Sequence, residues 1–461
     1  MVVQHNMQAA NANRMLNVTT SAQSKSTEKL SSGYRINRAA DDAAGLTISE
    51  KMRKQIKGLD RASTNAEDGV SAVQTAEGAL TEVHSMLQRM NELATQSANG
   101  TNSNTDRKAI QDEIDQLTTE IDRVSETTKF NETYLLKGDG AEKEHNVNAH
   151  DAGLDGVTLT DKGDKVEVTL KTLNAGDKIS IAGKNYTIGS TVDEAQALVT
   201  EQEKKDGSIT IGGVKYSYDD GNGKWKDADG NDAGTNGAIT IVGGDVVSNG
   251  NKTLTAMKDV AGAADGIDDN DSTVITAKKA YQLQTAEIVK ASSIGADTAA
   301  VNNTTNNDAF DKATTSFELK KGTVSYKDSL SFNLHVGADA DMTNKITVNI
   351  DSMNSAGLGV KGIKADTEQD ATYAIDAIAD AISTVSSQRS ALGAVQNRLE
   401  HTINNLDNVV ENTTSAESRI RDTDMAEEMV NYSKNNILAQ AGQSMLAQAN
   451  QSNQGVLSLL Q

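Results

Sequence analysis

Three short stretches of the sequence carry residue types that could bind a metal ion or a phosphate group. His145 and His150 stand five residues apart in a polar segment, and the imidazole ring is a common metal ligand. Zinc proteases instead place two histidines four residues apart on one face of a helix, with a glutamate beside the first. We therefore expect both histidines to be exposed side chains of a polar linker, not ligands.

The other two stretches resemble binding loops only in part. The segment "IAGKN" around Lys184 lacks the upstream glycine and the following Ser or Thr of a phosphate-binding loop. The segment "DADGND" offers Asp227, Asp229 and Asn231, but Asp232 occupies the place of the required glycine, and no glutamate closes the loop. We interpret it as a polar turn. No GxSxG pattern accompanies the many serines. The sequence therefore predicts no catalytic residue, no cofactor and no metal, and we expect no enzyme.

Composition limits the class of protein further. The chain has 461 residues, a formal net charge of -21, no Cys and no Pro. Without Cys there is no disulfide, thiolate nucleophile or Cys-based metal site, and without Pro very long helices are permitted. The acidic balance disfavours a nucleic-acid partner. No apolar run approaches the roughly 20 residues of a membrane span, and the first residues do not resemble a cleaved secretory signal.

Three long helices are predicted from apolar periodicity. The first runs from Asp41 to about Asn99, with Asp41 and Asp42 as candidate caps, and the third from about Asp370 to Val410. Apolar residues repeat in them at alternating spacings of three and four, the pattern of a helix packed along a partner. This predicted seam comprises Val73, Leu80, Val83, Leu87 and Met90 in the first helix, Ile114, Leu117 and Ile121 in the second, and Leu392, Leu399 and Leu406 in the third.

These helices lie at the two ends of the chain, and a heptad helix does not bury its apolar seam alone. We expect the N- and C-terminal segments to pack antiparallel against each other as a coiled-coil rod. Separate coiled coils, or homodimers formed through each seam, remain alternatives. Between them, residues 138–327 show alternating apolar residues and Gly/Asn/Asp turns in "KVEVTLKTL", "DKISIAGKNYTIG", "SITIGGVKYSYDDGNGKW" and "GAITIVGG". A helical interlude, "STVITAKKAYQLQTAEIVKASS", and a later hairpin, "LSFNLHVGADADMTNKITVNIDSM", complete a mainly α fold with a β-rich insert.

Both ends of the chain are nearly free of charge. Arg14 is the one charged side chain between Met1 and Ser24, and none follows Lys434. A helix face of Gln, Asn, Ser and Ala can be packed closely without an ionic desolvation cost. We therefore expect the two ends to pack together and against copies of themselves, as the core of a polymer whose acidic middle faces water; frayed tails are the alternative. The packing residues predicted for this core are Met15, Val18, Ala22, Leu438, Ala441, Met445 and Ala449.

Long stretches at both ends resemble one family. "LSSGYRINRAADDAAGL" at residues 30–46 and "NAEDGVSAVQTAEGAL" at 65–80 strongly resemble bacterial flagellin, as do "LGAVQNRLEHTINNL" at 392–406 and "SMLAQANQSNQGVLSLL" at 444–460. The resemblance divides the chain into an N-terminal filament-core helix at 1–44, rod segments at 45–137 and 328–419, a variable outer region at 138–327, and a C-terminal filament-core helix at 420–461.

The resemblance implies an extracellular subunit of the flagellar filament that serves motility. It implies export through a type-III-like apparatus and four kinds of partner: copies of the chain, an export chaperone, the filament cap and the hook–filament junction proteins. It also implies recognition by a vertebrate Toll-like receptor of the innate immune system, at positions that correspond to Arg89, Leu93 and Glu113. A hook–filament junction protein, and a filament subunit whose outer region is an adhesin, are the alternatives; a soluble coiled-coil effector is more distant.

Overall fold

The computed structural model describes residues 6–205, 207–234, 237–258, 265–302 and 315–459. Contacts divide the chain into two compact units. Unit 1 comprises Met1–Ala72, Phe332–Val348 and Ala394–Gln461, and unit 2 comprises Val73–Ser331 and Asn349–Gly393. Two long helices, α2 (Ala43–Ser97) and α6 (Glu368–Arg421), contribute residues to both units.

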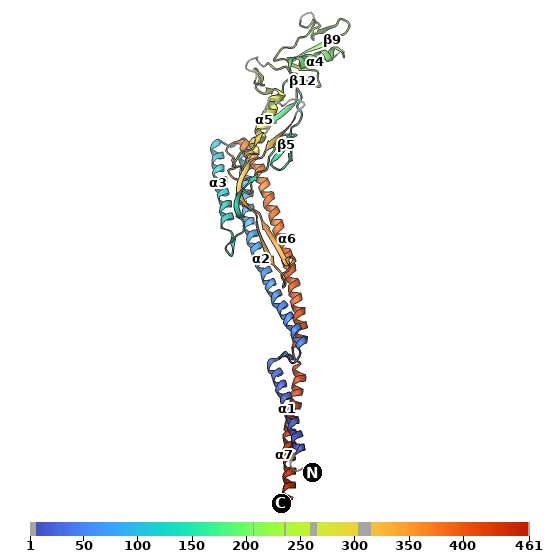
Figure 1. Cartoon of the computed structure of the whole chain (residues 1–461). Helices are drawn as coiled ribbons and strands as arrows, with labels where there is room; N and C mark the ends of the chain where they lie inside the picture. Colours follow the sequence, from blue (N-terminus) through green and yellow to red (C-terminus); the bar gives the residue numbers. More distant parts are fainter. Residues whose placement is uncertain (1–5, 206, 235–236, 259–264, 303–314, 460–461) are drawn as a thin grey trace. The chain divides into compact units, whose positions relative to one another are not determined.

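Unit 1 contains two further helices, α1 (Met7–Ser32) and α7 (Met425–Leu459), which lie side by side (Figure 1). The side chain of Asn6 accepts a hydrogen bond from the backbone N–H of Ala9 and so caps α1, and Gly33 ends the helix in the left-handed conformation. Asp42 caps α2, because its Oδ1 accepts the backbone N–H of Gly45 at 2.8 Å. These caps set the helix boundaries that the side-chain pattern alone leaves open.

The unit 1 parts of α2 and α6 run antiparallel. The Ser49 hydroxyl lies 3.2 Å from a carboxylate oxygen of Glu417, and the Ser63 hydroxyl lies 3.1 Å from Asp407. A hairpin of β17 (Leu330–His335) and β18 (Lys345–Ile350), with the short helix η1 (Met342–Asn344) in its loop, covers these helices. Its apolar contacts form a small core with Ala66, Ile346 and Leu399 at the centre.

Unit 2 also contains helix α3 (Asn104–Thr127), in addition to its parts of α2 and α6. Ser103 and Asp106 form a capping box at its start. Arg107, although buried, is satisfied because it donates hydrogen bonds to the carbonyl groups of Ser97 and Asn99 at the end of α2. The guanidinium group of Arg389 in α6 binds the Glu77 carboxylate in α2 at 2.7 Å. Polar contacts at the ends and along the sides thus fix the register of the packed helices.

The rest of unit 2 is β-rich, with two helices, α4 (Val192–Glu203) and α5 (Ala277–Ala291). Within each sheet, the strands are given in the order in which they neighbour one another. Two sheets are strand pairs: β1 (Lys129–Phe130) with β2 (Thr133–Tyr134), and β16 (Thr323–Asp328) with β3 (Asp139–Asn146). The larger sheets are β14 (Val301–Asn302), β15 (Ser316–Lys320), β5 (Lys165–Thr169) and β4 (Thr158–Asp161); β13 (Val274–Ile275), β7 (Lys184–Ile188) and β6 (Lys178–Ile181); and β10 (Lys224–Lys226), β9 (Val214–Asp219), β8 (Ser208–Ile211), β11 (Val246–Ser248) and β12 (Thr253–Thr255). One apolar core surrounds Tyr281 and Phe317, and another surrounds Trp225.

The predicted fold class, mainly α with a β-rich insert, is confirmed. In each unit the N- and C-terminal helical segments pair within the chain, as expected. Two local expectations were incomplete or wrong. The segment "GAITIVGG", residues 237–244, is not a strand, because Gln196 of α4 binds the backbone of Ile239 and Ile241 in place of a neighbouring strand. Helix α4 itself was not foreseen, although Thr191 and Glu194 form a capping box at its start.

Candidate assembly surface

Helices α1 and α7 form an antiparallel pair. Near the start of α1, the side-chain amide of Asn6 donates a hydrogen bond to the carbonyl of Ala449 at 3.1 Å. Near its end, the ammonium group of Lys29 lies 3.7 Å from the Glu428 carboxylate. These two contacts are far apart along both helices, so the pairing extends over most of α1.

Small residues allow the two helices to come close. A Cβ placed at Gly442 of α7 would lie 3.4 Å from Leu16 Cδ1 of α1. Ser26 in α1 and Ala439 in α7 are buried in the described chain. Such a seam of Gly, Ala and Ser leaves the bulkier apolar side chains of both helices on other faces.

The turns between the paired helices are held by backbone contacts. Arg35 N–H donates to the carbonyl of Arg421 at 2.7 Å, and Thr423 N–H donates to the carbonyl of Gly33 at 3.0 Å. The Arg421 guanidinium lies over the ring of Tyr34, 4.7 Å from its centroid. This bridge fixes the end of α1 against the junction of α6 and α7.

The residues predicted to pack in a filament core lie mostly outside the α1–α7 seam. Met15, Val18, Leu438 and Met445 are between 47% and 61% exposed. Ala441 is also exposed, whereas Ala22 and Ala449 are half-buried. The five exposed side chains among them are therefore accessible in the single chain.

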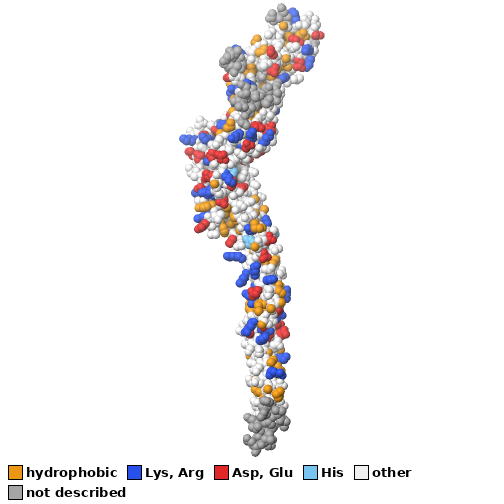
Figure 2. All heavy atoms as spheres, in the orientation of Figure 1, with side chains coloured by type: hydrophobic (Ala, Val, Ile, Leu, Met, Phe, Trp, Pro, Cys, Tyr) orange, Lys and Arg blue, Asp and Glu red, His pale blue; other side chains and the backbone are white. Residues whose placement is uncertain are grey.

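Further large apolar side chains extend this exposed surface, and Figure 2 shows hydrophobic side chains along this part of the chain. They are Met7, Met425, Met429, Val430 and Ile437. We call these five residues, together with Met15, Val18, Leu438 and Met445, the assembly face. Large apolar side chains that stay exposed on two paired helices indicate a protein–protein interaction site in soluble proteins.

The predicted seam of the long helices is buried. In unit 2 the side chains of Val73, Leu80, Val83, Leu87, Met90, Ile114, Ile121 and Leu392 are at most 1% exposed, and Leu117 is half-buried. In unit 1 Leu399 and Leu406 are buried. Their burial accounts for the alternating three-and-four spacing read from the sequence.

The three positions that the flagellin resemblance assigns to receptor binding differ in exposure. Arg89 Nε donates a hydrogen bond to Glu113 at 2.9 Å, and its Nη1 donates to Glu92 at 3.1 Å. The hydrogen bond with Glu113 raises the pKa of Arg89 from its ordinary value. Arg89 and Glu113 are about half exposed, whereas Leu93 is only 2% exposed. The first two form a surface ion pair between α2 and α3, whereas Leu93 is buried.

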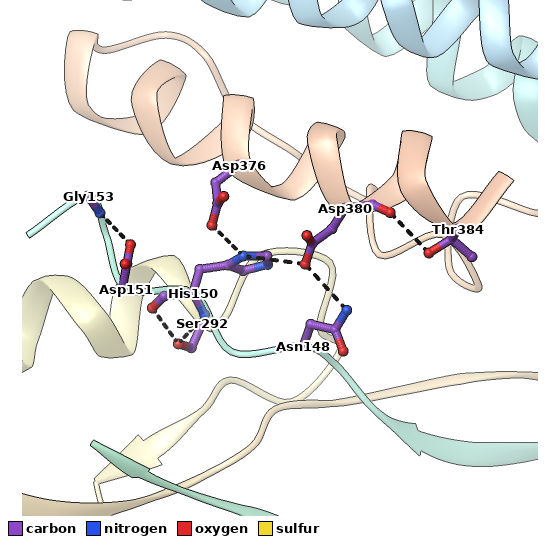
Figure 3. Close-up of polar contacts among 8 residues, drawn as sticks. All are labelled: Asn148, His150, Asp151, Gly153, Ser292, Asp376, Asp380 and Thr384. Atoms are coloured by element: carbon purple, nitrogen blue, oxygen red, sulfur yellow. Dashed lines mark hydrogen bonds and ion pairs between the residues drawn. The ribbon is translucent and has the colours of Figure 1, made fainter. Parts of the chain in front are cut away.

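His150 is a buried side chain at the centre of a polar cluster in unit 2 whose two aspartates are exposed (Figure 3). It is 5% exposed, and its Nδ1 lies 2.8 Å from Asp376 and 4.0 Å from Asp380, both in α6. Its backbone N–H donates to the hydroxyl of Ser292, which in turn donates to the His150 carbonyl. The expectation of an exposed histidine is therefore wrong at this position. The segment after β3 contacts α6 through His150 and Asn148, which bind Asp376 and Asp380, and Val147 enters an apolar cluster with Val324 and Ala356.

His145 and the calcium-like segment have structural partners. The ring of His145 stacks on Tyr326 with centroids 4.0 Å apart. One oxygen of Asp227 accepts the backbone N–H groups of Asp229 and Asn231, which makes the segment a turn. Within the described ranges no group of three His, Cys, Asp or Glu side chains could hold a metal ion.

No helix among the described residues is long and apolar enough to cross a bilayer.

Comparison with known proteins identifies the family. The model of the bacterial flagellin N-terminal helical region matches residues 3–141, and that of the C-terminal helical region matches residues 375–460. A flagellin of Clostridium tyrobutyricum is 41% identical over 460 residues, which cover 98% of this chain and all of the relative. The chain belongs to the bacterial flagellin family. The flagellin match covers α1, most of α6 and all of α7, so it includes the assembly face.

Other relatives agree on the family. Polar flagellin A of Vibrio parahaemolyticus is 35% identical over 461 residues, and the match covers 99% of each chain. Among solved structures, FliC from Burkholderia pseudomallei is 17% identical with a TM-score of 0.27, covering 72% of this chain and 99% of that one. Hook-associated protein 3 of Legionella pneumophila is 13% identical with a TM-score of 0.33, covering 80% and 98%. The assignment of this flagellin to the filament subunits rests on the sequence matches and not on these distant structures.

Proposed function

We propose that this flagellin polymerises outside the cell into the flagellar filament that drives motility, with α1 and α7 in the filament core. The observation that carries the proposal is the assembly face. It presents nine exposed large apolar side chains on two helices whose remaining surface is largely Gln, Asn, Ser and Ala. A face of this composition gains free energy when it is buried, at roughly 25 cal/mol per Å² of apolar surface.

The absence of ionic groups lowers the cost of that burial. Transfer of a charged group from water into a protein interface is expensive unless the group is paired. After Lys434 no charged side chain has to be paired, and the amides of Gln and Asn can donate and accept hydrogen bonds with equivalent groups on a neighbouring subunit.

The distribution of charge between the units supports the same arrangement. Unit 1 holds 15 of the 44 Lys and Arg residues and 17 of the 65 Asp and Glu residues, which leaves 29 and 48 for unit 2. Unit 1 is therefore nearly neutral, and unit 2 carries almost all of the net charge. Copies of unit 1 can approach closely with little repulsion, whereas unit 2 is suited to contact with water.

The assembly face is built from two different helices. A contact of the α1 surface of one copy with the α7 surface of another is heterologous, since the two surfaces differ. Heterologous contacts that do not close into a ring produce open helical filaments. This is the symmetry that a filament subunit requires, and it needs no enzymatic activity.

We also propose that the chain leaves the cell unfolded through the flagellar type-III-like apparatus, with its N-terminal region as the signal. An export chaperone would hold α7, and the cap and hook–filament junction proteins would contact the ends of the filament. The support is indirect. Without Cys no disulfide has to form outside the cell, and without Pro no slow prolyl isomerisation delays folding at the tip.

Recognition by a Toll-like receptor is proposed through the ion pair of Arg89 and Glu113, since both side chains are accessible. Leu93 is buried and would support the pair from beneath. Binding of the monomer to the receptor ectodomain tests this. Arg89→Ala and Glu113→Ala should weaken binding, while Glu82→Ala, an exposed carboxylate on α2, serves as the control. Unchanged affinity in the first two variants removes this part of the proposal.

Seeded elongation tests the polymerisation. Purified monomer is added to short filament fragments, and growth is followed by electron microscopy. Deletion of residues 435–461 should abolish growth, and Leu438→Lys should slow it strongly, because a lysine would have to be buried unpaired. Val242→Lys changes an exposed apolar residue of unit 2 and should elongate normally. Normal growth of the truncated chain would contradict the core assignment.

A further inference from the structure

Methionine is concentrated on the assembly face. Of the 12 methionines in the sequence, Met7, Met15, Met425, Met429 and Met445 lie on α1 and α7 and are between 49% and 74% exposed. We call these five the face methionines. Exposed thioethers are unusual for a residue type that commonly fills gaps in cores, as Met90 and Met353 do here with no exposed surface.

The thioether group reacts with peroxides. A hydroperoxide transfers one oxygen atom to the sulfur, which is oxidised by two electrons, while the peroxide is reduced to water or an alcohol. The product, methionine sulfoxide, is polar and chiral and accepts hydrogen bonds strongly. Methionine sulfoxide reductases reverse the step: the oxygen leaves as water, and two thiols are oxidised to a disulfide.

We propose that the face methionines form a modification site at which oxidation by a hydroperoxide blocks assembly of the free subunit and enzymatic reduction restores it. The effect on assembly rests on the proposed function. In the free chain the five sulfurs belong to accessible side chains, so a small oxidant reaches them. In a filament built through the assembly face the same side chains are covered, and the reaction is confined to subunits that have not yet been added.

The chemistry of the face explains why sulfoxide would block packing. Met15 lies one helical turn from Val18, and Met445 lies one turn from Ala441, so both methionines have an apolar neighbour on their own helix. A sulfoxide oxygen buried there without a donor loses its hydrogen bonds to water. One such group is expected to raise the critical concentration for assembly by roughly tenfold.

The chain provides internal controls for reactivity. Met342 in η1 is 72% exposed but does not belong to α1 or α7, so it should be oxidised without affecting assembly. Met90 and Met353 are fully buried and should resist oxidation in the folded chain. One oxidised sample therefore shows separately which methionines react and whether their oxidation affects assembly.

The experiment treats full-length monomer with hydrogen peroxide, locates sulfoxides by peptide mass spectrometry and measures the critical concentration on filament seeds. We expect oxidation of the face methionines and Met342, a critical concentration raised at least roughly tenfold, and recovery after treatment with methionine sulfoxide reductases A and B and a dithiol. Unchanged assembly of a chain with all five sulfoxides would overturn the proposal.

Two further measurements make the result specific. A variant with Met15→Leu and Met445→Leu should lose part of its sensitivity to peroxide, whereas Met342→Leu should keep all of it. In preformed filaments the face methionines should react at least tenfold more slowly than in monomer. Equal rates for the face methionines in both states would count against the proposal. Failure of untreated monomer to elongate seeds would instead contradict the proposed function itself.

Discussion

Leu16 of α1 covers Gly442 of α7, with its Cδ1 3.4 Å from the position that a Cβ at Gly442 would occupy. Alanine therefore fits at this position in ordinary van der Waals contact, and a larger side chain does not. The pairing of the two terminal helices thus depends on a small residue at one point of α7, within a sequence that already lacks charged groups.

Gly442→Ala should preserve the close packing of α1 on α7, whereas Gly442→Leu should disrupt it. Alanine raises helix propensity by about 1 kcal/mol and needs no movement of Leu16. Leucine must displace Leu16 and separate α1 from α7 at this point. We expect Gly442→Ala to retain seeded elongation and Gly442→Leu to lose it, as followed by light scattering. Equal elongation of both variants would show that the helices do not pack closely at this residue in the assembly.

Two glycines within α2 provide a second matched pair. A Cβ at Gly69 would lie 2.2 Å from Leu334 Cδ1 in the hairpin of unit 1, whereas Gly78 has nothing within 4 Å. Gly78→Ala should stabilise the chain by up to about 1 kcal/mol through helix propensity. Gly69→Ala should destabilise it by about 1–3 kcal/mol because Leu334 must shift. Urea unfolding followed by circular dichroism measures both, and stabilisation by Gly69→Ala would contradict the close packing of the hairpin.

The His150 cluster gives a prediction for unit 2. His150→Ala removes the contact with Asp376 and leaves a gap in a buried site, so the free energy of unfolding should fall by about 1–3 kcal/mol. His401→Ala changes an exposed histidine in unit 1 and should alter stability by less than about 0.5 kcal/mol. Thermal unfolding by calorimetry compares the two. Equal, small changes would show that the cluster does not hold the segment after β3 against α6.

Acid should weaken the β-rich part of unit 2. The Lys321 ammonium group, followed by the Gly163 N–H, lowers the pKa of the Asp161 carboxyl group. Because the folded-state pKa lies below the unfolded value of about 3.9, the stabilisation is present above that value and is lost as the pH falls through the folded-state pKa. Urea midpoints measured from pH 6 to pH 2 should therefore drop.

Asp161→Asn should lower stability at pH 6 and reduce the dependence on pH, since the titrating group is gone. Asp155→Asn is the control, because that carboxylate is 88% exposed in its pair with Lys171. A pH dependence that is the same in Asp161→Asn as in the parent chain would exclude this ion pair as a contributor.

Long apolar periodicity made the helices predictable from the sequence. The heptad spacing around Leu80 and Leu399 describes side chains that are fully buried, and Asp42 marks the start of α2 as a cap. Such patterns depend on residues three or four positions apart, so a short stretch of sequence is enough to recognise them. The uncharged composition of α1 and α7 likewise indicated a surface for packing, although it could not show that Leu16 and Gly442 form the seam between them.

Features that depend on distant residues were not predictable. His150 is buried because Asp376, more than 200 residues away, lies beside it, and a polar neighbourhood in the sequence gave the opposite impression. The stretch around Ile241 alternates like a strand, but Gln196 occupies its backbone groups. In both cases a tertiary contact decides the structure, and no local pattern records it.

Accessibility of the assembly face before and after polymerisation tests the central claim most directly. Because the chain has no Cys, single substitutions Val18→Cys, Met445→Cys and Val242→Cys each provide one thiol for labelling with a maleimide. In monomer all three sites should be labelled, since all three parent side chains are exposed. In filaments grown on seeds, we expect protection of the thiols at positions 18 and 445 and unchanged labelling at position 242. Labelling of all three thiols at monomer rates in intact filaments would contradict it.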